Sequence, residues 1–134
     1  MSCGVKIRLH EFPPALECDV SRIQALWNDG LSRFGGPFLA GRSFTAADAF
    51  FAPVAFRAQT YDLPLDAVFA AYVVRLLGLP SMREWYAAAL AEPFRDEPHE
   101  QEIGQMGSVV ADFRAPPQAA TMSAAMARSI RPRL

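Results

Sequence analysis

The stretch Gly36-Pro-Phe-Leu-Ala-Gly-Arg-Ser-Phe-Thr-Ala-Ala-Asp48 decides how this chain folds. Thr45 stands where a helix should begin, and Asp48 follows three residues later. The Thr45 hydroxyl can accept a hydrogen bond from the Asp48 amide while the Asp48 carboxylate accepts one from the Thr45 amide, which is an acidic version of the capping box. Phe44 before this cap and Ala49 at the fourth helical position can form a hydrophobic staple. The sequence therefore predicts a helix whose first turn is fully specified.

The capping box is a folding element, because no nucleophile and no metal-ligand spacing accompanies it. The helix that it starts runs from Ala46 to about Ala58, with Pro53 inside it. Every residue from Ala49 to Phe56 is apolar, which leaves this helix almost no polar face. A helix that is apolar on all sides is typical of a protein core. We therefore expect it to be the central, buried helix of the fold.

An amphipathic helix precedes this one, because apolar residues recur at spacings of three or four. Gly35 and Gly36 should end it, since glycine adopts the left-handed conformation common at helix C-termini. Pro14 suits its first turn, where the missing proline N–H would be unpaired anyway. The recurring apolar residues are Leu16, Val20, Ile23, Trp27, Leu31 and Phe34.

Two further helices follow the capped one. Residues 65–77 are apolar on most sides and are followed by Gly78, a stop signal. Ser81 and Glu84 form a second capping box, which should open a last helix that runs to Ala91.

The two ends of the chain are less regular than its middle. We expect residues 1–15 to be a connector or a partial helix, although the alternation of Val5, Ile7 and Leu9 with polar residues also fits a short strand. Residues 16–102 form the helical domain, so the expected fold class is all-α, a helical bundle. Residues 103–134 are rich in Ala, Pro, Met and Gly without a sustained period, and we expect them to form a mobile tail.

Length and composition limit the function classes. With 134 residues, 51% of them hydrophobic and 20% charged, the chain can build one small domain with a real core. A net charge of -1 and a single lysine, Lys6, argue against a nucleic-acid surface. The longest apolar stretches are too short to span a bilayer, which argues against a membrane protein.

Cys3 and Cys18 belong to no Cys-x-x-Cys pair and have no His cluster near them, so their spacing predicts neither a zinc site nor a redox site. Neither cysteine has the basic group and helix N-terminus that would activate a nucleophilic thiol. Cysteines without a disulfide pattern fit a reducing compartment. We therefore predict a cytoplasmic protein without a metal.

Several features of the middle of the chain occur in a definite order. They are Trp27, the glycine-rich approach Gly35-Gly-Pro-Phe-Leu-Ala-Gly41, the Thr45 to Asp48 box, Pro53, and the stretch Leu79-Pro-Ser-Met-Arg-Glu-Trp85. In this order they resemble the C-terminal, all-helical domain of the glutathione S-transferase superfamily over about residues 16–102. The chain looks most like bacterial members, a few of which are described as maleylacetoacetate isomerase-like.

The resemblance implies where the chemistry of such an enzyme lies. Superfamily enzymes bind glutathione mainly through a thioredoxin-like domain that precedes the helical one, and their catalytic Ser, Tyr or Cys lies near the start of that domain. A thioredoxin-like domain needs roughly 80 residues of alternating strands and helices, whereas only about fifteen residues precede the first clear helix. We therefore expect this chain to hold neither a thioredoxin-like domain nor a catalytic residue.

The helical domain of the superfamily usually contributes the wall against which the electrophilic co-substrate binds. The candidates for this wall are Phe51, Arg57 and Tyr61, with aromatic residues near Phe94 or Phe113. Arg57 could attract an anionic substrate at the open end of its helix. The alternative is a surface arginine, or one that pairs with a neighbouring acid.

Two functions stay open at this point. In the first, the chain is a partial glutathione S-transferase-like protein: the helical, substrate-side domain of an enzyme that conjugates glutathione to an electrophile or isomerises one, and inactive alone. It then carries no cofactor, and glutathione is the co-substrate once a thioredoxin-like domain completes the enzyme. In the second, the chain is a stand-alone, non-catalytic helical module that binds another protein. Both predict an exposed apolar patch around the first helix and the capped helix. We therefore expect self-association, as a dimer, or docking of the missing thioredoxin-like domain.

Overall fold

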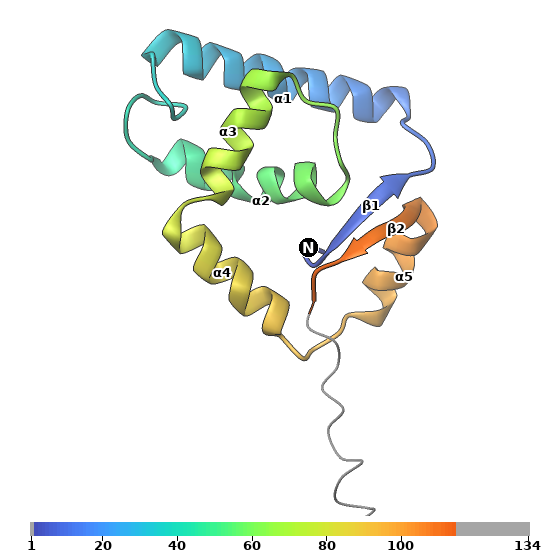
Figure 1. Cartoon of the computed structure of the whole chain (residues 1–134). Helices are drawn as coiled ribbons and strands as arrows, with labels where there is room; N and C mark the ends of the chain where they lie inside the picture. The colour runs from blue at the N-terminus through green and yellow to red at the C-terminus, as the bar shows by residue number, and fades with distance from the viewer. Residues whose placement is uncertain (1, 115–134) are drawn as a thin grey trace, which may run out of the picture.

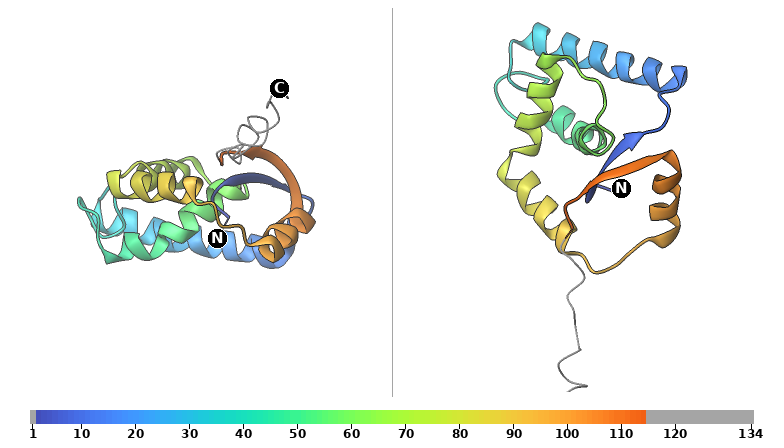
Figure 2. Two further views of the ribbon diagram at one scale, coloured as in Figure 1. Left: turned by 90° about the horizontal axis from the view of Figure 1, so that it is seen from below. Right: turned by 45° about the vertical axis from the view of Figure 1, so that its right-hand side comes forward.

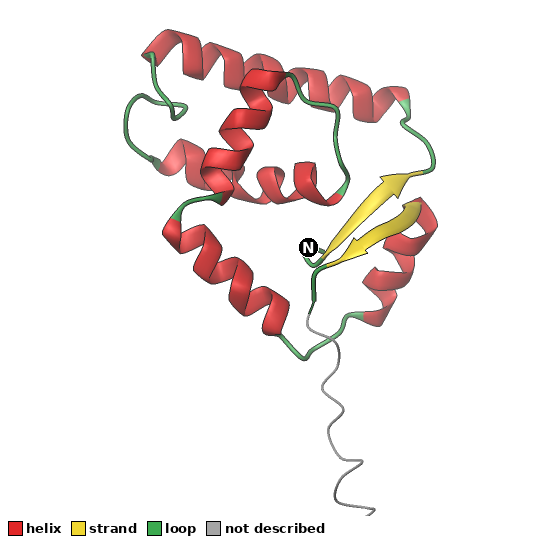
Figure 3. Cartoon of the chain, in the orientation of Figure 1, coloured by secondary structure: helices red, strands yellow, loops and turns green. Residues whose placement is uncertain are grey.

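The computed structural model describes residues 2–114. They form a mainly helical fold with one small, two-stranded sheet (Figures 1 and 3). In chain order the elements are β1 (Val5–Leu9), α1 (Pro14–Phe34), α2 (Ala46–Thr60), α3 (Ala67–Leu77), α4 (Pro80–Ala91), α5 (Glu97–Met106) and β2 (Gly107–Asp112). The predicted fold class is confirmed, because helices carry most of the described residues.

Helix α1 begins and ends where the sequence predicts. Pro14 lies in its first turn, and Gly35 closes it with a φ of 59°, in the left-handed region. Glycine adopts this conformation without the steric cost that a Cβ would add. Val20 and Trp27 are buried on the inner side of the helix, so α1 is held to the fold by one apolar face.

The predicted capping box opens α2. Both of its reciprocal contacts are present, with Thr45 as the N-cap and Asp48 as the third helical residue. The Asp48 Oδ2 atom accepts from the Thr45 amide at 2.8 Å and from the Thr45 hydroxyl at 3.0 Å. Phe44 packs edge to face on Phe38, with ring centroids 6.2 Å apart, and Ala49 is exposed. The partner of the predicted staple residue is therefore a ring in the preceding loop.

The Asp48 carboxylate also joins α2 to two other segments. Its Oδ1 atom accepts from the Leu39 amide at 2.9 Å and from the Tyr72 hydroxyl at 3.0 Å, and the residue is fully buried. Burial by itself would raise the pKa of Asp48, but the hydrogen bonds from Leu39, Thr45 and Tyr72 outweigh it and hold the pKa below its usual value. The carboxylate therefore stays charged and fastens the loop before α2, the start of α2 and the middle of α3 to one another.

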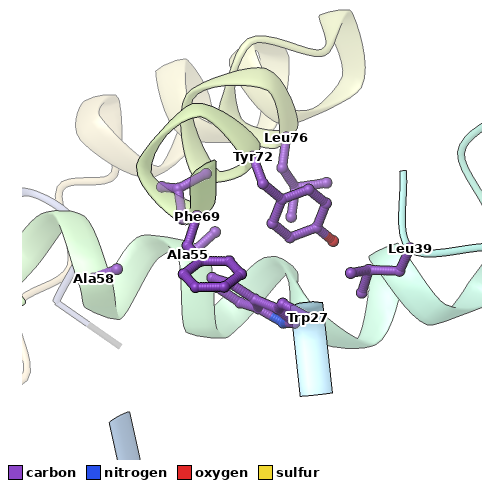
Figure 4. Packing of buried hydrophobic residues seen from close by; sticks show 8 residues of the cluster. Trp27, Leu39, Ala55, Ala58, Phe69, Tyr72 and Leu76 are labelled. Atoms are coloured by element: carbon purple, nitrogen blue, oxygen red, sulfur yellow. The ribbon is translucent and has the colours of Figure 1, made fainter. Parts of the chain in front are cut away.

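Trp27 lies at the centre of the main hydrophobic core (Figure 4). Its ring meets those of Tyr72 and Phe51 edge to face, at centroid distances of 5.0 and 5.6 Å, and that of Phe69 at 6.3 Å. Such arrangements suit the quadrupoles of aromatic rings. The other buried members of this core are Leu39, Ala55, Ala58, Val73 and Leu76.

Helix α3 lies across α1 and α2 and contacts both of them (Figure 1). Seen from below, α3 and α4 lie on one side of the helical region, while α1 and α2 lie on the other (Figure 2). Phe69, Tyr72, Val73 and Leu76 of α3 are buried at this crossing. The core is therefore the space between two helical layers.

The capped helix is only partly buried, which corrects the prediction of a central helix covered on all sides. Ala55, Phe56 and Ala58 of α2 are buried, whereas Phe50 is 84% exposed. The apolar composition of α2 did not predict its burial correctly, because α1 and α3 cover only one side of the helix. The other side is left open by the described residues. Within those residues, no helix is both long enough and apolar enough to cross a bilayer.

The start of the chain is a strand, which corrects the prediction of a connector or partial helix for residues 1–15. β1 pairs with β2 in antiparallel orientation, and Ile7 lies opposite Val109. A register shift between Lys6 and Ile7 leaves Val110 as an extra, bulged residue. The buried side chains of β1 form a second small core with Ile103 of α5. The alternation of apolar residues was therefore the correct signal.

The predicted mobile tail begins too early. Residues 103–106 complete α5, and residues 107–112 form β2. Ile103 is buried, and the Phe113 amide donates to the Gly4 carbonyl at 2.8 Å. These residues lack a sequence period because their order depends on pairing with β1. The remainder of the predicted tail, residues 115–134, lies outside the described residues.

The predicted capping box at Ser81 and Glu84 is absent. α4 begins at Pro80, its N-cap is Leu79, and no side chain caps it. Because the φ of proline is preset for a first helical turn, the helix starts one residue before Ser81. Ser81 and Glu84 therefore lie inside the helix and are exposed.

This difference between the two motifs gives a direct prediction. Thr45→Ala should lower the free energy of unfolding by about 1 kcal/mol or more, because it removes a true N-cap. Ser81→Ala should change it by no more than about 0.5 kcal/mol, as expected for an exposed position without a cap. Urea unfolding of the two variants measures both values. A larger loss for Ser81→Ala than for Thr45→Ala would contradict the assigned start of α4.

Candidate functional site

A hollow of about 520 Å³ lies where the start of β1 meets α4 and α5. We call it the N-terminal cleft. One wall comes from α4 and carries the half-exposed ring of Trp85. The other wall comes from the α4–α5 loop and α5, and includes the exposed ring of Phe94. The lining residues are Ser2, Cys3, Gly4, Val5, Trp85, Ala88, Ala89, Glu92, Phe94, Arg95, Asp96, His99, Glu100 and Arg114.

A smaller hollow of about 200 Å³ adjoins the N-terminal cleft. It is lined by Arg57, Thr60 and Tyr61 at the end of α2, and it shares Ser2 and His99 with the cleft. The structure therefore brings together two of the three predicted wall residues, Arg57 and Tyr61. The third, Phe51, lines neither hollow, because its ring packs on Trp27 in the main core.

Most of the remaining cleft residues were not predicted from the sequence. Phe94 belonged to the wider set of predicted aromatic groups, but Trp85 pointed only to a helix start. Trp85 enters the cleft because Phe56 of α2 packs against it, at a centroid distance of 5.0 Å. Such a contact joins residues 29 positions apart, and no local spacing could show it. Phe113, the other predicted aromatic residue, is partly exposed and does not line the cleft.

The arginines of the cleft are already neutralised by acidic neighbours. Arg114 contacts Glu100 at 2.7 Å and Asp112 at 2.6 Å, and Arg95 lies 3.8 Å from Glu100. The hydrogen bonds from Arg114 lower the pKa of Asp112 to about 2. This network fastens the end of β2 to α5. Arg57 differs, because no carboxylate of residues 2–114 lies within ion-pair distance of it.

The thiol in the cleft is not activated. Cys3 is buried, and burial raises the pKa of its thiol above the usual value. The protonated thiol is a poor nucleophile. His99 lies 3.5 Å from Glu102, on its own helix. Cys18 is exposed. Among the described residues, no group of His, Cys, Asp and Glu has the arrangement of a metal site.

The cleft is thus suited to hold an aromatic or apolar group. Its volume lies within the range of about 300–1,000 Å³ that is common for small-molecule sites. Two aromatic rings flank it, and one arginine without an ionic partner lies in the adjoining hollow. Residues 2–114 place no activated nucleophile beside these groups. The described residues of the cleft therefore form a surface that could bind such a group.

A family model described as glutathione S-transferase, C-terminal domain, matches residues 20–88, just over half of the 134 residues. The match runs from within α1 into α4, and it includes Arg57, Tyr61 and Trp85. No curated protein and no solved structure matches the chain.

Proposed function

The chain belongs to the glutathione S-transferase C-terminal domain family, and on this premise we propose that it is the helical, substrate-side part of a glutathione transferase-like enzyme. In this role the electrophile binds in the N-terminal cleft. The co-substrate glutathione binds to a thioredoxin-like domain. That domain contacts the described residues as a partner, and the two together form the complete enzyme.

The observation that carries the proposal is that the matched segment supplies part of one wall of the cleft, Trp85 and Ala88 of α4, while the other lining residues lie outside residues 20–88. The family match ends in α4, and Trp85 on this helix faces the cleft. Arg57 and Tyr61 at the end of α2 lie in the same segment. Flat aromatic walls bind aromatic electrophiles by stacking and apolar burial. A cation nearby favours electrophiles that carry or develop negative charge.

The chain alone should not catalyse the conjugation of glutathione to an electrophile. Conjugation requires the thiolate of glutathione, and a thiol needs a basic or hydrogen-bonding neighbour to ionise at neutral pH. Cys3 in the cleft keeps its own proton, and the arginines beside it are paired with acids. Arg57, which has no ionic partner among residues 2–114, lines the adjoining hollow and not the cleft itself.

The finer features of the proposal rest on the ordered sequence motifs. They favour a bacterial enzyme of the maleylacetoacetate isomerase-like type, which would isomerise its electrophile after glutathione adds to it. The free cysteines Cys3 and Cys18 favour the reducing cytoplasm.

The electrophile wall is tested by binding without glutathione. Titration with 1-chloro-2,4-dinitrobenzene should quench the fluorescence of Trp85 and saturate, whereas buried Trp27 should respond little. Ala88→Phe should weaken binding at least about tenfold, because Ala88 lines the cleft and a ring there fills it. Ala87→Phe is the matched control, since Ala87 is exposed on the same helix and outside the lining. Equal binding by both variants would overturn the assignment of the cleft.

Exposed apolar residues near α1 and the start of α2 support self-association. Phe34 and Leu26 of α1 are 56% and 53% exposed, and Phe50 of α2 is 84% exposed. Large exposed apolar groups are typical of surfaces that bind other proteins. We propose that a second copy of the chain covers them, or the thioredoxin-like domain where it is present. The same surface would serve the alternative function, a non-catalytic interaction module.

Phe50→Glu should weaken this association. A charge at the centre of an apolar contact lacks a partner once it is buried, so the association constant measured by sedimentation equilibrium should fall at least about tenfold. Phe94→Glu is the control, because Phe94 is also highly exposed, at 74%, but lies in the loop after α4. A wild-type protein that stays monomeric across a wide concentration range would contradict the proposal.

A further inference from the structure

A second hollow, about 610 Å³ in volume, lies between α2, α3 and α4. We call it the helix groove. Its lining is mainly apolar and contains no aspartate or glutamate. The lining residues that carry the argument are Val73, Val74 and Leu77 of α3, and Arg83 and Tyr86 of α4.

Helix α4 separates the helix groove from the N-terminal cleft. Arg83 and Tyr86 line the groove, whereas Trp85, Ala88 and Ala89 line the cleft. Phe56 packs between the two, with ring centroids 5.0 Å from Trp85 and 5.3 Å from Tyr86. The groove is therefore distinct from the proposed electrophile site.

Two polar groups of the groove, the Tyr86 hydroxyl and the Arg83 guanidinium, can donate hydrogen bonds to a ligand. Gln59 Nε2 donates to the Tyr86 hydroxyl at 3.3 Å, so the hydroxyl proton itself is left to donate. A tyrosine hydroxyl keeps its proton at neutral pH, and burial raises the pKa of Tyr86 further. Arg83 is exposed, and no carboxylate of residues 2–114 lies within ion-pair distance of it.

Arg83 and Tyr86 lie three residues apart on α4, and residues at this spacing are neighbours on one helix face. A cation and a hydroxyl donor at such a separation suit the two oxygens of one carboxylate. Beside them, Val73, Val74 and Leu77 of α3 present apolar surface along the groove. An aliphatic chain laid on this surface would be removed from water.

We propose that the helix groove binds a small amphipathic carboxylate, with its carboxylate between Arg83 and Tyr86 and its aliphatic chain along α3. The volume of the groove lies in the range of about 300–1,000 Å³ that small-molecule sites occupy. Complementarity of charge selects the carboxylate, because the lining offers one positive charge and no negative one.

Decanoate is the probe that tests this site by calorimetry on the full chain. It should bind saturably, and decanol should bind about tenfold more weakly, because decanol lacks the charge that Arg83 attracts. Arg83→Gln should cause a similar loss for decanoate and little change for decanol. Arg22→Gln, on the exposed side of α1, should bind decanoate like the wild type.

A second pair of variants tests the place of the aliphatic chain. Val74→Glu should abolish decanoate binding, since it sets a negative charge in the groove, and Val74 is 72% exposed, so the fold should tolerate the change. Val68→Glu is the matched control, because Val68 is 61% exposed on the same helix but outside the lining. Absence of saturable binding to the wild type, equal affinity for decanol and decanoate, or binding that survives Val74→Glu would each overturn the proposal. So would a dimer that Val74→Glu dissociates and decanoate does not affect, because a second copy would then fill the groove.

Discussion

Asp48→Ala should lower the free energy of unfolding by about 3–5 kcal/mol, because it leaves several buried donors without an acceptor. The Leu39 amide, the Thr45 amide and the Tyr72 hydroxyl all donate to this carboxylate. Each buried group that loses its partner costs about 1–3 kcal/mol. Because small domains have a total stability of only about 5–15 kcal/mol, the variant should be close to unfolding.

Asp48→Asn separates the charge from the geometry. Its side-chain oxygen can still accept from Leu39 and Tyr72, but its NH₂ group would face the Thr45 amide, which is also a donor. We therefore expect a loss smaller than that of Asp48→Ala. Urea unfolding of the three proteins measures the order wild type, Asn, Ala. An Asp48→Ala variant as stable as the wild type would show that the carboxylate does not hold the fold together.

The same carboxylate gives a pH dependence. The pKa of Asp48 is lower in the folded chain than its ordinary value of about 3.9. Its contribution to stability is therefore fully present above pH of about 3.9, and it is lost as the pH falls through the folded pKa. The Asp48→Asn side chain does not take up a proton as the pH falls, so this part of the acid destabilisation should be missing from the unfolding curves of the variant.

Trp27→Ala should destabilise the fold by about 3–5 kcal/mol, which is the usual cost of removing a large aromatic ring from a core. Trp27 is fully buried and contacts the rings of Phe51, Phe69 and Tyr72. Its loss would leave a cavity between the two helical layers, because α1 and α3 meet around this side chain.

Trp27→Phe should cost much less than Trp27→Ala. The indole Nε1 is buried and has no hydrogen-bond partner within the described residues, so phenylalanine removes an unsatisfied donor while it keeps most of the ring contacts. Trp85→Ala is the control for removal of a tryptophan at the surface, because Trp85 is 48% exposed. Urea unfolding measures all three. A loss at Trp85 that equals the loss at Trp27 would contradict the assigned core.

The sequence predicted best the features that depend on neighbours along the chain. The box of Thr45 and Asp48 is local, since its two residues lie three positions apart, and so is the end of α1 at Gly35. The roles of Leu39 and Tyr72 as partners of Asp48 were not predictable, because only the packing of α3 brings Tyr72 to that carboxylate.

The missed elements depend on distant residues or on a competing local signal. β1 pairs with a strand about 100 positions later, and β2 has no clean alternation because Val110 is bulged. At α4 the Ser81 to Glu84 spacing imitates a capping box, but Pro80 already starts the helix. The candidate site shows the same limit: Arg57 and Tyr61 were named in advance, whereas Trp85 joins them only through contact with Phe56.

Calorimetric titration of the chain with glutathione tests the central claim most directly. In the proposed division of roles these helices form the electrophile wall, whereas a thioredoxin-like domain binds and ionises glutathione. We therefore expect no saturable heat with glutathione and no conjugation of 1-chloro-2,4-dinitrobenzene, under conditions in which that electrophile alone binds to the cleft. Saturable binding of glutathione, or turnover by the chain alone, would contradict the account.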